Sequence, residues 1–152
     1  MKKKTAILTI TIALIFALSG CTSGFFGKVN FGMTRDEVEK AELKLGEPTT
    51  ILDDESYLYR EYVLYNTGGD LILSFDENNK LDKITYYAYT EYTTDETEAE
   101  FMTQLQEAYP GAADASATAW TVADKDVTLT VQYASGTYLL VTFVPADDSA
   151  QK

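Results

Sequence analysis

The chain has 152 residues, with 24 acidic side chains against 12 basic ones and a formal net charge of −12. This excess of negative charge argues against a nucleic-acid-binding protein and against electrostatic attachment to anionic lipid head groups. The sequence contains no histidine, which removes the commonest general base and the commonest nitrogen ligand of metal ions. Because there is only one cysteine, no disulfide within the chain can stabilise the fold.

The first 20 residues are typical of a bacterial export signal. Lys2, Lys3 and Lys4 precede a nearly uninterrupted apolar run from Thr5 to Leu18, which is short for a membrane span. The ending Leu-Ser-Gly-Cys resembles the lipobox of bacterial lipoproteins. This resemblance implies cleavage before Cys21 and attachment of acyl chains such as palmitate to its sulfur and its new amine. The alternative is an ordinary cleaved signal peptide that leaves Cys21 as a free thiol.

Lipidation of Cys21 predicts an extracytoplasmic protein of the bacterial cell envelope that is anchored to a membrane. Each buried methylene contributes about 0.8 kcal/mol, so two or more acyl chains give stable anchoring. Removal of residues 1–20 takes away three lysines and leaves 9 basic against 24 acidic residues, a net charge of −15. Residues 21–30 are predicted to be the lipidated cysteine and a tether, in which Phe25, Phe26 and Val29 are expected to pack on the domain rather than lie at the bilayer surface.

The stretch from Phe31 to Pro48 predicts a first helix over about Thr34–Leu45. Thr34 and Glu37 have the spacing of a capping box, in which each side chain accepts a hydrogen bond from the other residue's backbone N–H. Gly46 and Pro48 are placed to end the helix.

Three segments rich in aromatic and β-branched residues follow, and each predicts a strand. They cover Tyr57–Tyr65, Leu71–Phe75 and Leu81–Tyr89. Residues 66–69 (Asn-Thr-Gly-Gly) predict the first turn, and residues 76–80 predict a hairpin loop.

The second half of the chain shows the same order of elements. Asp95–Tyr109 predicts a second helix, with Thr97 and Glu100 at capping-box spacing and Pro110-Gly111 at its end. Three further strands are predicted, at Ala119–Val122, Val127–Val131 and Thr137–Val144.

These elements predict an α+β fold of two tandem helix-strand-strand-strand repeats. The repeats cover residues 31–90 and 91–146 of a single domain, and residues 147–152 form a polar tail. Both helices are expected on one face of an antiparallel sheet, which leaves the other face open to solvent or to a partner. The alternative is that two generic hairpins resemble each other by coincidence.

The motif Gly-Met-Thr-Arg-Asp-Glu-Val followed by Leu-Gly-Glu-Pro resembles the start of the SmpA/OmlA lipoproteins. Their helix-then-three-strand domain is similar to the repeated unit of the β-lactamase inhibitor proteins. The matching positions are Gly32, Met33, Thr34, Val38, Leu45, Gly46 and Pro48. Two copies in one chain resemble the tandem arrangement of the inhibitor proteins. The resemblance implies a fold more directly than a function, and no partner-contacting residue is transferred from it.

The sequence predicts no catalytic residue, no cofactor and no metal site, and therefore no enzyme. Neither a nucleophile elbow nor a glycine-rich phosphate loop occurs. The acidic groups at 53–55 and 76–77 are interpreted as solvated loop charges. Carboxylate-only catalysis, and a calcium ion at residues 76–79, are the alternatives.

Tyrosine is the residue type that departs most from expectation, with eleven copies. Tyrosine combines a large apolar ring with a polar tip and is enriched at binding surfaces. The candidate partner-binding residues are Tyr57, Tyr59, Tyr65, Tyr87 and Tyr89. The alternative for each ring is core and cross-strand packing. We therefore expect a lipid-anchored binding module that contacts a protein partner with a basic surface through a tyrosine-rich sheet face. The alternative function is an envelope assembly or structural lipoprotein similar to SmpA/OmlA.

Overall fold

The computed structural model describes residues 26–41, 50–52, 56–89, 94–134 and 138–146. The predicted signal peptide, the lipidation site Cys21 and the polar tail 147–152 lie outside these residues. The predicted helix stop at Gly46 and Pro48 also lies outside them.

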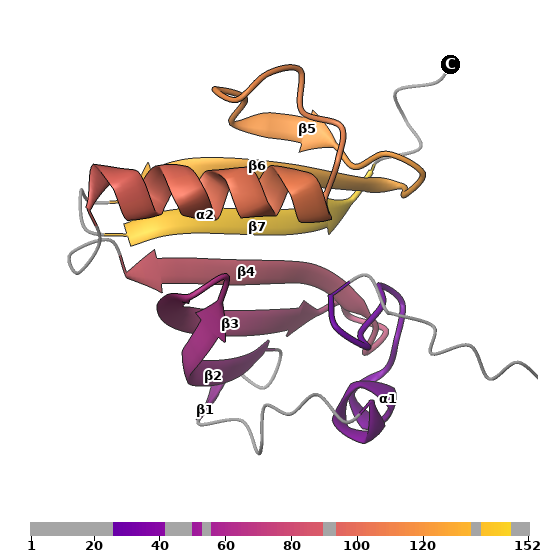
Figure 1. Cartoon of the computed structure of the whole chain (residues 1–152). Helices are drawn as coiled ribbons and strands as arrows, with labels where there is room; N and C mark the ends of the chain where they lie inside the picture. The colour runs from indigo at the N-terminus through magenta and orange to yellow at the C-terminus, as the bar shows by residue number, and fades with distance from the viewer. Residues whose placement is uncertain (1–25, 42–49, 53–55, 90–93, 135–137, 147–152) are drawn as a thin grey trace, which may run out of the picture.

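The described residues form an α+β fold with one antiparallel sheet, as predicted (Figure 1). The strands follow the spatial order β1-β2-β3-β4-β7-β6-β5. In chain order, the elements are α1 (Arg35–Lys40), β1 (Thr50–Leu52), β2 (Ser56–Leu64), β3 (Thr67–Phe75), β4 (Leu81–Tyr89), α2 (Asp95–Ala108), β5 (Ala119–Thr121), β6 (Val127–Ala134) and β7 (Tyr138–Pro145). Strand β1 was not expected from the sequence.

Both helices begin directly after a threonine cap, and the cap of α2 lies three residues before the predicted one. At α1 the capping box is confirmed, because the Glu37 N–H donates to Thr34 Oγ1 and the Thr34 N–H donates to Glu37 Oε2 at 2.8 Å. At α2 the predicted capping box of Thr97 and Glu100 is wrong. The cap is Thr94, whose extended backbone precedes the helix and whose N–H donates to Thr97 Oγ1 at 2.8 Å.

The turn between β2 and β3 also differs from the prediction. It consists of Tyr65 and Asn66, both with positive φ (48° and 61°), as in the two-residue turns that match the twist of a hairpin. The predicted turn residues Gly68 and Gly69 belong to β3 instead. A Cβ on Gly69 would lie 2.6 Å from Tyr86 Cζ and closer still to the Tyr87 carbonyl oxygen, so glycine permits a close approach there.

A β-bulge in β2 changes the side to which the following residues point. Tyr59 pairs with Leu71 and Tyr62 pairs with Gly69, so Arg60 and Glu61 together oppose the single residue Asp70. Glu61 adopts a positive φ of 55° to make the bulge. As a result, Tyr59 and Tyr62 face the same side of the sheet although their numbers differ by three.

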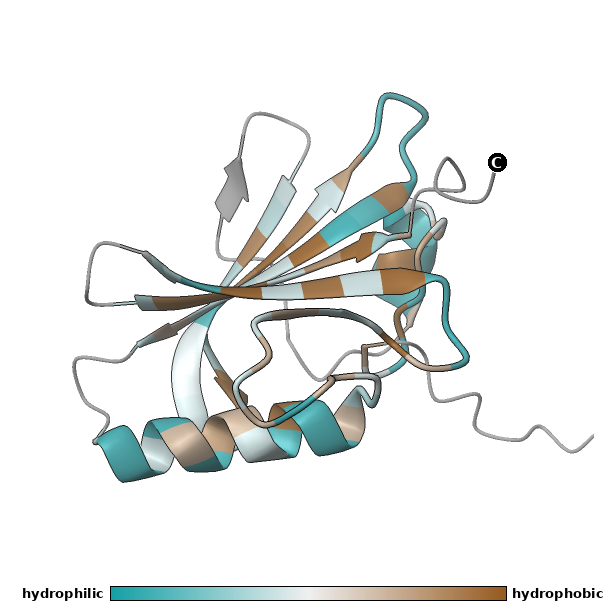
Figure 2. Cartoon of the chain, turned by 90° about the horizontal axis from the view of Figure 1, so that it is seen from above, coloured by the Kyte–Doolittle hydropathy of each residue, from teal (hydrophilic) through white to brown (hydrophobic). Residues whose placement is uncertain are grey.

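The hydrophobic core covers one face of the sheet. Directly opposed residues in an antiparallel sheet share a face, so the strand register identifies its members. One row across the sheet contains Tyr57, Leu73, Ile84, Phe143, Leu129 and Trp120, all buried. Val38 of α1 and Phe101 and Leu105 of α2 belong to the same cluster, and Figure 2 shows α2 along one side of the sheet.

Two residues of the predicted tether are part of this core. Phe26 and Val29 are buried and exchange two backbone hydrogen bonds of 3.0 Å. The Phe26 ring lies 5.9 Å from that of Phe143. The expectation that the tether packs on the domain is confirmed for these two residues, and Phe25 lies outside the described residues.

Strands β4 and β7 pair at the centre of the sheet. Each is the last strand of one predicted repeat. Going outward from the centre, β4 is followed by β3 and β2, and β7 is followed by β6 and β5. Such an order arises whenever two antiparallel meanders join through their last strands. The order therefore agrees with an internal repeat without establishing one.

Candidate functional site

Tyr57 and Tyr59 do not lie on the open face of the sheet. Their side chains are 6% and 5% exposed and point to the face that the helices contact. The alternative interpretation, core packing, describes these two rings. A partner at the opposite face has no access to them.

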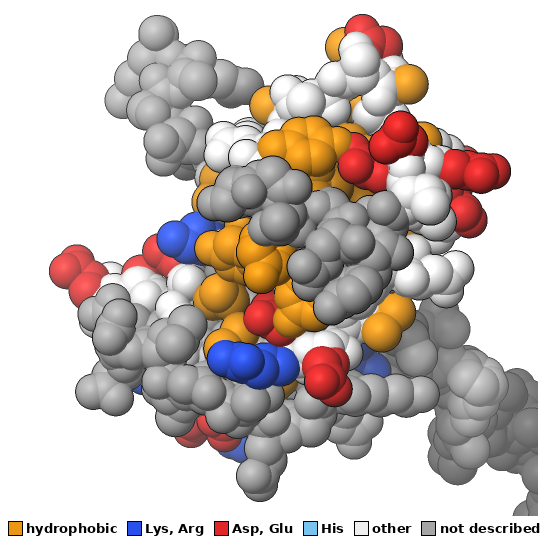
Figure 3. Space-filling view, turned by 90° about the vertical axis from the view of Figure 1, so that its left-hand side faces the viewer, with side chains coloured by type: hydrophobic (Ala, Val, Ile, Leu, Met, Phe, Trp, Pro, Cys, Tyr) orange, Lys and Arg blue, Asp and Glu red, His pale blue; other side chains and the backbone are white. Residues whose placement is uncertain are grey.

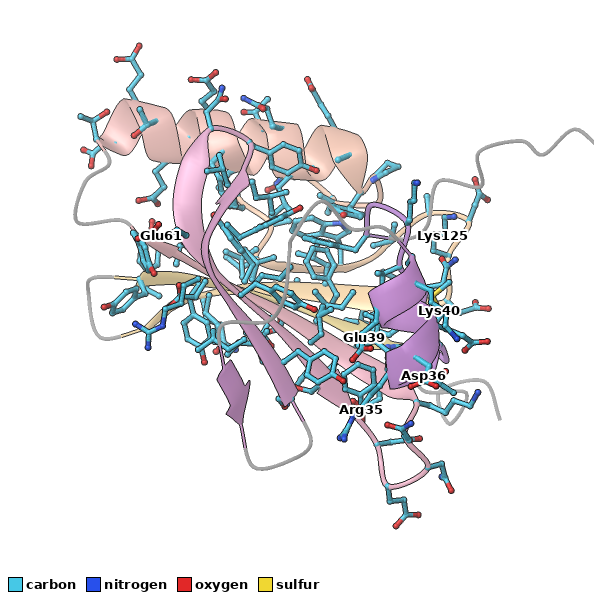
Figure 4. All side chains as sticks on the ribbon, turned by 90° about the horizontal axis from the view of Figure 1, so that it is seen from below. Arg35, Asp36, Glu39, Lys40, Glu61 and Lys125 are labelled. Atoms are coloured by element: carbon cyan, nitrogen blue, oxygen red, sulfur yellow. The ribbon has the colours of Figure 1, made fainter. Side chains whose placement is uncertain are left out.

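The Tyr57 ring attaches α1 to the sheet. Its hydroxyl donates to Glu39 Oε1 at 2.7 Å, and its ring meets that of Phe75 edge-on with 5.3 Å between centroids. The Arg35 guanidinium lies 5.2 Å from the Phe75 centroid, within cation–π range, and Figure 4 shows Arg35 and Glu39 on α1 (purple). Burial, together with the hydrogen bond to Glu39, raises the pKa of Tyr57 to about 12.

Tyr65 is half-buried at the hairpin turn and also faces the helix side. Its ring lies 5.9 Å from that of Phe101 in α2, and burial raises its pKa. Its neighbour in space, Tyr86, stacks on the same Phe101 ring at 6.1 Å. Tyr65 thus contributes to packing between the hairpin and α2.

Tyr87 and Tyr89 lie on the opposite face, as the alternation along the third predicted strand indicates. Tyr89 pairs directly with Tyr138 of β7, and their rings meet at 68° with 5.9 Å between centroids. Tyr138 is 37% exposed, while Tyr87 and Tyr89 are partly exposed. We call Tyr87, Tyr89 and Tyr138 the tyrosine cluster.

An acidic residue fixes one ring of the tyrosine cluster. The Tyr89 hydroxyl donates to Asp70 Oδ1, and Asp70 pairs with Tyr87 across β3 and β4. Burial, this hydrogen bond and the Asp70 charge raise the pKa of Tyr89 to about 12. The ring therefore stays neutral at physiological pH and is held in one orientation.

Tyr138 was not among the partner-binding residues predicted from the sequence. Its strand was predicted, but its place beside Tyr89 follows from the pairing of β4 with β7, which joins two distant parts of the chain. Only the strand order reveals that contact. Tyr133 was likewise not singled out, although it is 63% exposed.

Tyr133 lines a groove between α2 and β6. Two adjoining hollows, of about 650 and 330 Å³, share Glu98, Met102, Ala115 and Tyr133 in their walls. The larger one also reaches Val131 and Leu139 of the sheet. We call this feature the α2–β6 groove. It lies on the helix side of the sheet, opposite the tyrosine cluster.

The residues that the structure describes contain neither a metal-binding cluster nor a membrane-spanning helix. Within these residues, no three Cys, Asp or Glu side chains converge closely enough to hold a metal ion. Among the helices formed by the same residues, none has the length and hydropathy needed to cross a bilayer.

The chain was also compared with known proteins. No protein-family model, no curated protein and no solved structure matches it. The resemblance to SmpA/OmlA lipoproteins and β-lactamase inhibitor proteins thus stays a prediction from the sequence motif.

Proposed function

We propose that the protein is a lipid-anchored extracytoplasmic binding module that contacts a protein partner through the open face of its sheet. The observation that carries the proposal is the tyrosine cluster, in which the rings of Tyr89 and Tyr138 are in contact and Tyr87 lies two residues from Tyr89 on the same face, opposite the core. The lipid on Cys21 holds the domain at the membrane, and Phe26, five residues further along the chain, is buried in the core.

The tyrosine cluster has the properties of a binding surface. Tyrosine supplies a large contact area at low cost in conformational entropy, and its hydroxyl can form hydrogen bonds to water before a partner binds. The hydrogen bond from Tyr89 to Asp70 holds one ring in place before a partner arrives. Ordering a side chain in advance reduces the entropy lost on association.

The charge of the chain indicates what kind of partner fits. With 24 acidic against 12 basic residues, a basic partner surface is steered toward the domain and an acidic one is repelled. Raising the salt concentration should therefore slow association.

The proposed fold is a tandem repeat of helix and three strands. The outward order from β4 and β7 and the threonine cap ahead of each helix support this interpretation. The capped α1, followed along the chain by the β2-β3-β4 meander, also favours a second candidate function, an envelope assembly lipoprotein similar to SmpA/OmlA. Copurification with an outer-membrane complex favours that candidate, and a soluble or wall-associated partner favours the binding module.

The test uses a photo-crosslinking amino acid in place of Tyr138 in the full lipoprotein, in intact cells. We expect a specific crosslinked protein, and we expect the double variant Tyr87→Ser, Tyr138→Ser to lose it in a pull-down. Glu107→Ser is the control, because Glu107 is exposed on α2, on the other side of the sheet, and does not line the α2–β6 groove. Loss of the partner in Glu107→Ser alone, or equal capture by all variants, would refute the assignment to the tyrosine cluster.

A further inference from the structure

Strand β6 extends beyond the strand that covers its outer edge. β6 runs from Val127 to Ala134, but β5 pairs only with Thr128–Thr130. On its other edge, β6 pairs with β7 along its whole length, up to Ala134 opposite Tyr138. Among the described residues, the outer edge of β6 is therefore unpaired after the contact at Val131.

Tyr133 presents a free backbone donor and acceptor at this edge, within the part of the chain that the structure describes. The Val131 N–H donates to the Thr118 carbonyl at 2.7 Å, and the Val127 carbonyl accepts from Val122 at 2.8 Å. Both groups point to the β5 side. Because backbone groups alternate along a strand, the N–H and C=O of Tyr133 point to that side as well.

The α2–β6 groove lies beside this edge and is apolar inside. Tyr133 shares a face with Leu139, its partner in β7, and with Val131, and both of these side chains are buried. Met102 of α2 forms the opposite wall together with Ala115. A strand added at the edge would direct every second side chain toward this apolar surface.

The rim of the groove is acidic. Asp95 and Glu98 line it, and α2 (DETEAEFMTQLQEA) carries five carboxylates and no lysine or arginine. Figure 3, which views the end of the molecule where α2 begins, shows acidic side chains gathered beside hydrophobic ones. A cationic occupant fits this rim. A second copy of the chain fits poorly, because it brings the same negative charge.

We propose that the α2–β6 groove binds an extended, basic segment of a protein partner. The segment adds a strand to β6 through the backbone of Tyr133, packs apolar side chains against Met102 and Leu139, and places lysine or arginine near Asp95 and Glu98. This combination of main-chain hydrogen bonds and alternate side-chain pockets is an established mode of peptide recognition. The groove lies opposite the tyrosine cluster, so this proposal stands independently of the proposed function.

The test measures peptide binding to the full-length lipoprotein in non-ionic detergent by fluorescence anisotropy. The probe is a labelled, capped heptapeptide of alternating lysine and valine. The control peptides replace valine by serine, which keeps the charge, or lysine by glutamate, which reverses it. We expect only the lysine–valine peptide to bind well, and its affinity to fall with added salt. Equal binding of the lysine–serine peptide would overturn the proposal, because it would indicate charge attraction alone.

Two variants locate the site. Tyr133→Pro removes the edge N–H but no hydrogen bond to β7, since the backbone of residue 133 points away from that strand. We expect it to weaken binding about tenfold, and Glu98→Lys to do the same. Glu107→Lys is the matched control, since it changes the charge of α2 equally but does not line the groove. Equal losses in Glu98→Lys and Glu107→Lys would overturn the assignment to the groove.

A further measurement does not depend on how the proline variant folds. Hydrogen exchange of the Tyr133 amide in the unmodified chain should slow when the lysine–valine peptide is present, because a new strand protects it. Unchanged exchange at saturating peptide would refute strand addition. Self-association of the chain in the absence of peptide, with the same amide protected, would instead identify a second copy as the occupant and overturn the proposal.

Discussion

Two neighbouring glycines in β3 should respond in opposite ways to the same substitution. Replacing glycine by alanine reduces the entropy of the unfolded chain, which stabilises a protein by about 0.4–1 kcal/mol where the native backbone accepts alanine. At Gly68 an added Cβ meets nothing within 4 Å. We therefore expect Gly68→Ala to raise the free energy of unfolding by that amount.

At Gly69 the added methyl group would lie 2.6 Å from Tyr86 Cζ and within contact of the Tyr87 backbone oxygen. The backbone of β4 cannot move without breaking its pairing with β3 and β7. The Tyr86 ring is fully buried, and its hydroxyl donates to the Thr67 and Tyr62 carbonyls. Overpacking of this kind costs about 1–3 kcal/mol, and displacement of the hydroxyl adds about 1 kcal/mol. The cost exceeds the entropic gain, so Gly69→Ala should destabilise by about 1–3 kcal/mol.

The assay is urea unfolding of the full-length chain in detergent, followed by the fluorescence of Trp120. This is the single tryptophan of the chain, and it is buried in the core. The midpoint should rise for Gly68→Ala and fall for Gly69→Ala, with unchanged slopes. Equal or higher stability of Gly69→Ala would refute the reasoning, because the Tyr86 ring could not then lie over residue 69.

Three other predictions concern the cap, the tyrosines and alkaline pH. Thr94→Ala should cost about 1 kcal/mol by removing the cap of α2, and an unchanged thermal midpoint would contradict that assignment. Tyr57→Ser should lower the free energy of unfolding by several kcal/mol, because the Tyr57 ring is in the core. Tyr138→Ser should change the urea midpoint little, because Tyr138 is exposed. Similar urea midpoints for the two variants would contradict this difference in burial. The pKa values of Tyr57 and Tyr89 are about 12 in the folded chain, against 10.0 for an unperturbed tyrosine. The unfolded state therefore loses these protons at lower pH than the folded state. As a result, the free energy of unfolding should decrease as pH rises from about 10 to 12. A pH titration of unfolding checks this, and a flat profile above pH 10 would argue against the hydrogen bonds from Tyr57 to Glu39 and from Tyr89 to Asp70.

Features encoded within a few residues could be predicted from the sequence. The Thr34–Glu37 capping box needs only two residues at the right spacing, and it is present. Leu81–Tyr89 was predicted with the bounds of β4, because the run is long, rich in β-branched and aromatic residues, and bounded by polar residues. The alternation of side chains along this strand also places Tyr86 on the face opposite Tyr87 and Tyr89, and Tyr86 is buried there.

Features that depend on distant contacts could not be predicted. The position of α1 and the register with β3 decide to which side of the sheet Tyr57 and Tyr59 point. Both depend on residues far away in the sequence. The bulge at Arg60–Glu61 has no glycine to signal it, and the turn at Tyr65-Asn66 begins with a residue that rarely adopts positive φ. The Tyr89–Tyr138 contact required the strand order.

The central position of β7 has a consequence for how the protein acquires its structure. β7 pairs with β4 on one side and with β6 on the other, so residues 138–145 join the two halves of the sheet. Until that segment is available for pairing, β4 and β6 each keep an unsatisfied backbone edge. Pairing between segments so far apart in sequence forms slowly, and exposed strand edges invite aggregation. A chain that ends before Tyr138 would therefore leave an incomplete sheet with two exposed edges, and addition of the final strand would complete the sheet.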